Sequence, residues 1–168
     1  MHNRYKKFNA ILIFSLLLTF PFPLDSQDRQ EIETGNVIFF HPDGTALAGW
    51  NAIRLLYYGP DGELSWDRLG NIGMYQGHLT NSLTASSEGG ATVHAYGVKV
   101  PLFSYGMRGT EPLLSRSGSK LSIMMEAKGK GIHIGIINSG KIVEPGTGVF
   151  VASDKSRGNE DAISKKII

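Results

Sequence analysis

The stretch TASSEGGATVHAYGVK, residues 84–99, decides how the rest of the chain is interpreted. Two adjacent serines, Ser86 and Ser87, precede two glycines and a short run that predicts a helix over 91–96. The start of a helix offers unpaired N–H groups and the positive end of a dipole, which together suit an anion. A serine at this place is either a nucleophile or an N-cap that satisfies backbone donors, and these residues alone favour the N-cap.

Apolar runs and helical periodicities on both sides of this stretch alternate along the chain. We predict buried strands over 36–40, 72–79 and 132–137, and helices over 46–58, 120–128, from 149 onward and over 159–168. In the helix over 120–128 we expect a cap at Ser119, with Leu121, Met124 and Met125 facing inward. Alternating strands and helices predict an α/β fold with a mainly parallel sheet flanked by helices.

Three loops follow the predicted strands and carry polar residues. Asp43 follows the first strand, Ser86 and Ser87 follow the second, and Asn138 and Ser139 follow the third. Ligands of parallel α/β sheets bind at the carboxyl ends of the strands. The sequence therefore predicts that these three loops meet at one edge of the sheet.

The N-terminus has the pattern of an export signal. Arg4, Lys6 and Lys7 precede an apolar run over 10–20, which prolines close. We interpret residues 1–26 as a signal peptide, with a retained membrane anchor as the alternative, and residues 27–168 as the mature chain, long enough for one domain. The protein is then expected to be periplasmic or extracellular, with no membrane attachment after cleavage.

Composition excludes several classes of function. The chain of 168 residues has no cysteine, which removes disulfides, thiolate metal sites and cysteine nucleophiles. The formal net charge of +2 is already carried by residues 1–26, which hold three basic residues and one aspartate. The remainder is therefore close to neutral, and we expect no nucleic-acid partner.

Other short motifs in the sequence match known functional patterns only in part. The run from Gly135 to Lys141 resembles a P-loop, but Ile142 stands where a hydroxyl would be needed to hold magnesium. Ser87 has a glycine two residues after it but an alanine two residues before it, so it matches a hydrolase nucleophile elbow only in part. His78, His94 and His133 show no metal-ligand spacing among themselves.

One ordered series of motifs does match a known pattern. It consists of NVIFFHPDGT at 36–45, Ser86 and Ser87 followed by Ala-Thr at 91–92 and Gly-Val-Lys at 97–99, and the stretch from Gly135 to Arg157. In order and spacing this series resembles the alkaline phosphatases. The resemblance covers nearly all of residues 27–168 and implies a three-layer α/β sandwich that hydrolyses phosphate monoesters with Zn²⁺ and Mg²⁺. It also implies that residues 27–168 are the N-terminal part of that domain. Whether this chain forms a homodimer is left open.

The resemblance also implies roles for individual residues. Ser87 matches the nucleophile that becomes a phosphoserine, and Arg157 matches the arginine that binds two phosphate oxygens. Asp43 and Glu144 match metal ligands, and Thr147 matches a hydroxyl ligand if the loop shifts by one residue. Arginine suits bidentate phosphate contact, and a bound metal lowers the pKa of a serine.

Departures from the family pattern limit what we expect of this chain. Ser86 stands where the family usually has an acidic residue, and the Asp-x-x-x-His and Asp-His zinc motifs are missing from the sequence. We therefore expect a sandwich that is incomplete at its C-terminus and a chain that is poorly active by itself. Two alternatives stay open. The first is a non-catalytic remnant or binding module, and the second is a serine esterase that uses Ser87 with His41 or His94.

Overall fold

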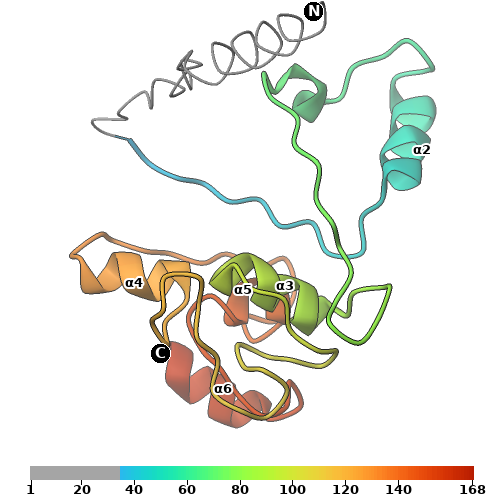
Figure 1. The fold of residues 1–168 in the computed structure, drawn as a ribbon. Coiled ribbons are helices and arrows are strands. Elements are labelled where there is room, and N and C mark those ends of the chain that lie inside the picture. Colours follow the sequence, from blue (N-terminus) through green and yellow to red (C-terminus); the bar gives the residue numbers. More distant parts are fainter. Residues whose placement is uncertain (1–34) are drawn as a thin grey trace, which may run out of the picture. The chain divides into compact units, whose positions relative to one another are not determined.

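The computed structural model describes residues 35–168, so the predicted signal peptide lies outside the described residues. The chain divides into two units, Met1–Ile38 and Phe39–Ile168, and only residues 35–38 of the first are described. The regular elements of the second unit are helices (Figure 1). They are α2 (Leu47–Tyr57), the short 3₁₀ helix η1 (Ser65–Arg68), α3 (Ser87–Tyr96), α4 (Ile123–Gly129), α5 (Pro145–Gly148) and α6 (Glu160–Ile167).

The predicted sheet is not observed among residues 35–168. The three apolar runs at 36–40, 72–78 and 132–137 have no regular structure, and only isolated bridges such as Leu79 with Ser82 are formed. A parallel strand needs a paired neighbour and a covered face. These runs have neither, since Ile72 and Ile137 are 97% and 94% exposed. The three-layer sandwich therefore remains a prediction.

The central helix α3 forms for reasons that are local to its sequence. The Ser86 hydroxyl accepts a hydrogen bond from the Gly89 N–H at 3.1 Å, which is a standard N-cap contact. The helix ends at Gly97, whose φ of 69° is left-handed and suits glycine. The helix predicted over 91–96 is thus confirmed, and it begins four residues earlier than predicted.

The core surrounds α3, which packs against α5 and α4. Tyr105 and Val100 are fully buried beside it, and α6 contributes Ile163. In Figure 1, α3 and α5 lie next to each other in the second unit. The buried apolar cluster comprises Leu79, Ala91, Val93, Ala95, Tyr96, Val100, Tyr105, Leu113, Val143, Val149, Phe150, Ala152 and Ile163.

The other predicted helices agree in part. The helices over 46–58 and 159–168 correspond to α2 and α6. The one over 120–128 begins later, because Ser122 and not Ser119 caps α4 through a bond from the Met125 N–H. Leu121 is consequently exposed, whereas Met124 packs against the core as predicted. The helix predicted from 149 onward is wrong: α5 ends at Gly148, one residue before it.

Helix α2 has no buried residue and is attached to η1 by side chains. Arg54 of α2 forms an ion pair with Asp67 of η1 at 2.7 Å, and the Trp50 and Trp66 rings lie 5.3 Å apart. The hydrogen bond from Arg54 lowers the pKa of the Asp67 carboxyl. None of the helices in the described part of the chain is long and apolar enough to span a membrane.

The Thr92 hydroxyl provides a first testable contact. This fully buried group donates to the Ser104 carbonyl at 2.6 Å and accepts from the Gly106 N–H at 2.8 Å. Thr92→Val keeps the shape but leaves both backbone groups without a partner, so we expect a loss of about 2 to 4 kcal/mol in the free energy of unfolding, measured by urea denaturation. Thr92→Ser keeps the hydroxyl and should lose only about 1 kcal/mol. Equal losses in the two variants would contradict the assignment.

Candidate functional site

The two adjacent serines have different roles in the structure. Ser86 is the N-cap of α3, whereas Ser87 is the first residue of the helix. The Ser87 hydroxyl donates to the Asp43 carboxylate at 3.2 Å. Asp43 lies in the turn that follows the apolar run at 36–40, so two segments 44 residues apart meet here. Ser86 is therefore the N-cap of α3, and the Ser87 oxygen, which is not needed for capping, is available to act as a nucleophile.

A histidine pair attaches the Asp43 turn to the core. His41 Nδ1 lies 3.1 Å from the Gly146 carbonyl oxygen, and His41 Nε2 lies 3.1 Å from His94 Nδ1. Phe39 and Phe150 pack around these rings. Burial lowers the pKa of His94 below its usual range, and the nearby His41 and Lys99 charges lower it further. The turn is thereby held against both α3 and α5, with Asp43 directed to Ser87.

This arrangement gives no direct support to the esterase alternative. A serine esterase needs a histidine within hydrogen-bonding distance of the serine oxygen. In the structure the Ser87 hydroxyl forms its hydrogen bond with Asp43, and the His41 ring forms hydrogen bonds with His94 and with the Gly146 carbonyl instead.

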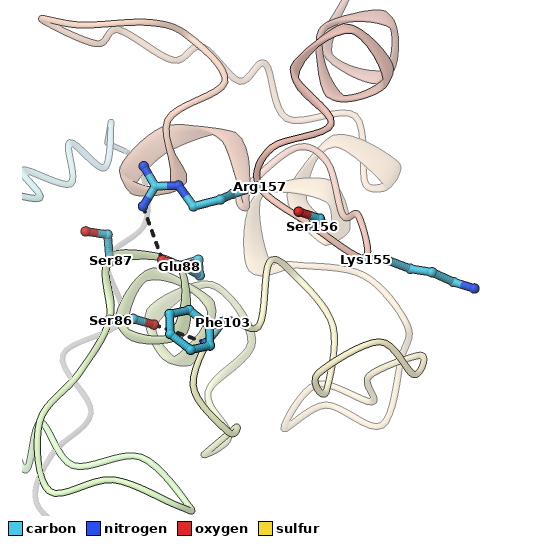
Figure 2. A pocket seen from close by; sticks show the side chains of 7 residues that line it. All are labelled: Ser86, Ser87, Glu88, Phe103, Lys155, Ser156 and Arg157. Carbon is cyan, nitrogen blue, oxygen red and sulfur yellow. Dashed lines mark hydrogen bonds and ion pairs between the residues drawn. The ribbon is translucent and has the colours of Figure 1, made fainter.

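A pocket of about 460 Å³ opens beside Ser87. Figure 2 shows the Arg157 side chain extending toward Ser87 and Glu88, while the Lys155 side chain points away from them. Ser87 belongs to α3 and Arg157 to the segment before α6, so α3 and the C-terminal region both contribute to the pocket. The lining residues are Ser86, Ser87, Glu88, Phe103, Lys155, Ser156 and Arg157.

The Arg157 guanidinium is engaged by two carboxylates. Its Nη1 donates to Glu88 at 3.3 Å, and its Nη2 donates to Glu144 at 2.7 Å. The Glu88 side chain is only 5% exposed, and a buried carboxylate is costly without a cation beside it. Glu88 was not among the residues predicted from the sequence; an acidic residue in the first turn of a helix was the available signal.

The three predicted metal ligands do not form one group in the structure. Glu144 precedes α5 and pairs with Arg157, while Asp43 bonds Ser87. The Thr147 hydroxyl donates to backbone carbonyls of its own loop and lies 2.8 Å from the Asn138 amide. Within residues 35–168, no group of three or more His, Asp and Glu side chains is placed to hold a metal ion. As these residues lie, they do not fit a zinc or magnesium ion, and the ligand assignment stays a prediction.

Competition for Arg157 is testable by phosphate binding. An anion in the pocket has to displace the exposed Glu144 carboxylate from Nη2. We expect Glu144→Gln to bind inorganic phosphate up to about fivefold more tightly, since an exposed ion pair contributes about 1 kcal/mol at most. Titration calorimetry on the full chain measures this.

A matched control for this prediction is Glu160→Gln. It removes an exposed ion pair with Lys141 whose members do not line the pocket. That variant should bind phosphate as the unmodified chain does. Unchanged or weaker binding by Glu144→Gln would contradict the competition.

Comparison with known proteins identifies the family of the chain. The family model described as alkaline phosphatase matches residues 34–167. No curated protein and no solved structure matches the chain significantly. The match spans nearly all the residues that the structure describes, including Asp43, Ser87, Glu144 and Arg157. The chain belongs to the alkaline phosphatase family.

Proposed function

We propose that this chain carries the serine and arginine half of a phosphate-monoester hydrolase site, with Ser87 as nucleophile and Arg157 as phosphate ligand. The observation that carries the proposal is that Ser87 and Arg157 line one pocket, with the Arg157 side chain extending toward Ser87 (Figure 2). Membership of the alkaline phosphatase family supports phosphatase-like hydrolysis in general terms. The assignment of these two residues goes beyond that membership.

The proposed reaction has two steps. The Ser87 oxygen attacks the phosphorus atom, the bond from phosphorus to the alcohol oxygen breaks, and the alcohol leaves with a proton from water. The Ser87 proton passes to the Asp43 carboxylate, which already accepts it in a hydrogen bond. Water then attacks the phosphorus of the phosphoserine, and the bond from phosphorus to the Ser87 oxygen breaks. The Asp43 proton returns to that oxygen and restores the hydroxyl. One proton of the attacking water neutralises the hydroxide that was left when the alcohol took its proton, so hydrogen phosphate is released. The N-terminus of α3 favours the negative charge throughout.

We also propose slow turnover by this chain. Both terminal nitrogens of Arg157 donate to carboxylates, so bound phosphate competes with Glu88 and Glu144 for the guanidinium. Family membership suggests Zn²⁺ and Mg²⁺ dependence, with Asp43, Glu144 and Thr147 as the proposed ligands. Because these three residues are not gathered in the structure, no step of the proposed reaction passes through a metal.

Location and assembly remain proposals that rest on the sequence. We propose export to the periplasm or extracellular space, directed by residues 1–26, and phosphate monoesters as small-molecule partners. A homodimer is proposed on the resemblance alone, and no nucleic-acid partner is proposed because the chain after residue 26 is nearly neutral.

The proposal is tested by trapping the covalent intermediate. The full chain is incubated with para-nitrophenyl phosphate, quenched in acid and digested, and the peptides are measured by mass spectrometry. We expect one phosphoryl group on Ser87. A chain without the phosphoryl group, or one that carries it on another residue, would overturn the assignment.

A second candidate is a non-catalytic binding module on the same scaffold. The engagement of Arg157 by two carboxylates favours it, since the guanidinium is held in a structural ion pair. Trapping of the phosphoserine separates the two candidates. Phosphate binding together with a phosphoserine on Ser87 favours the enzyme, and phosphate binding without a phosphoserine favours the module.

A further inference from the structure

We propose that Phe103 determines specificity at this site by packing its ring against an aromatic leaving group, so that aryl phosphates are the preferred class of monoester. This inference rests on the proposed function of Ser87 and Arg157. It names the chemistry of the alcohol, which neither the family match nor the serine and arginine specify.

Phe103 lines the pocket with its ring accessible. The residue is 68% exposed and lies outside the buried core, yet it borders the same cavity as Ser87 and Arg157. Figure 2 shows the ring beside Ser86, next to the start of α3. Among the residues that line this pocket, Phe103 is the one with a large apolar side chain, so its ring is the apolar surface available to a substrate held by Ser87 and Arg157.

The backbone of Phe103 is strained. Its φ of 62° is the only positive value at a non-glycine residue in the described part of the chain. A bulky side chain disfavours this left-handed conformation, and such residues persist where the surroundings impose it, often at ligand sites. A solitary exposed phenylalanine on a loop would need no explanation. The combination of an exposed ring, a strained backbone and a place on the pocket wall does need an explanation, and contact with a ligand supplies one.

Hydrogen bonds on both sides of Phe103 impose this conformation. The Leu102 N–H donates to the Asn81 side chain at 2.8 Å, and the buried Thr92 hydroxyl donates to the Ser104 carbonyl at 2.6 Å. The Phe103 N–H itself donates to the Ser86 hydroxyl at 3.3 Å, beside the nucleophile. The backbone of Phe103 is therefore held beside the N-terminus of α3, which places the residue at the edge of the site.

The phenyl ring of Phe103 favours substrates whose leaving group is aromatic. A phenyl ring offers offset or edge contacts to another ring and little to a small polar alcohol. We expect phenyl phosphate to bind about tenfold more tightly than methyl phosphate, which corresponds to about 1.4 kcal/mol. Both probes carry the same phosphate group, so the ratio isolates the contact with the alcohol.

The test uses the full chain with Ser87→Ala, so that neither probe is turned over, and titration calorimetry for both. Adding Phe103→Ala should reduce the ratio of phenyl phosphate affinity to methyl phosphate affinity from about ten to about one, and Phe103→Tyr, which keeps a ring, should retain the tenfold ratio. Phe103→Gly is the second variant without a ring, because glycine adopts a φ of 62° without strain and the fold is kept. It should also lose the preference.

Two results would overturn the inference. One is no preference for phenyl phosphate, or no detectable binding of it, in the Phe103 background. The other is a preference that survives Phe103→Gly. The two failures are distinguishable. A phosphoserine on Ser87 without any aryl preference overturns this inference and leaves the hydrolase proposal standing. An aryl preference without a phosphoserine overturns the hydrolase proposal and leaves Phe103 only as an aryl contact in a binding site.

Discussion

A chain that carries Ser87→Ala is expected to form no phosphoserine, and its turnover of a phosphate monoester should fall by roughly 10³-fold or more, the scale of removing a nucleophile. Ser87 has a hydroxyl at the start of α3 that is not used as the N-cap, and that hydroxyl donates to a carboxylate in position to take its proton. The measurement is release of para-nitrophenol over time, with the acid-quenched mass spectrum taken in parallel.

The neighbouring serine supplies the control for this prediction. Ser86→Ala removes the N-cap bond to Gly89 and the bond from Phe103, so it should reduce stability by about 1 kcal/mol. It should still form the phosphoserine. Turnover that survives in Ser87→Ala, or a phosphoserine that disappears in Ser86→Ala while the chain stays folded, would contradict the assignment of roles between the two residues.

Local features of the fold could be predicted from the sequence. The serine before a helical run and the glycine after it predict α3 correctly, because caps depend on neighbouring residues only. The helix predicted over 159–168 corresponds to α6 (Glu160–Ile167), although its N-cap residue Asn159 makes no side-chain capping bond. Ser119 was the wrong cap for α4, since a serine three residues later also fits and the Ser122 hydroxyl additionally bonds the Phe150 carbonyl.

Features that depend on distant partners could not be predicted. The apolar run at 132–137 has strand composition, but a strand also needs a neighbour to pair with, and Ile137 is exposed instead. The ion pair of Glu88 with Arg157 joins residues 69 apart, and the sequence holds no sign of it. The φ of Phe103 is imposed by Asn81 and Thr92, which the sequence does not mark as its neighbours.

Gly148→Ala is expected to lower the free energy of unfolding by roughly 3 kcal/mol or more, from overpacking together with a lost buried hydrogen bond. A Cβ at this position would lie 1.9 Å from the Tyr105 hydroxyl oxygen and 3.0 Å from the Val143 carbonyl oxygen. Tyr105 cannot move aside easily, because it is fully buried and its hydroxyl donates to Val143 at 2.7 Å. The same burial raises the pKa of the Tyr105 hydroxyl. Urea denaturation followed by circular dichroism measures the loss.

Gly146→Ala is the matched control, since it lies in the same short helix. Its Cβ would meet only His41 Nδ1, at an ordinary contact distance of 3.6 Å. We expect it to change stability by less than about 1 kcal/mol. Adding Tyr105→Phe to Gly148→Ala removes the oxygen in the closest contact and should recover part of the loss, although the ring carbon stays 3.1 Å away. Equal denaturation midpoints for Gly148→Ala and Gly146→Ala would show that α5 is not packed on Tyr105. The position of Glu144 beside Arg157, which depends on α5, would then lose its physical basis.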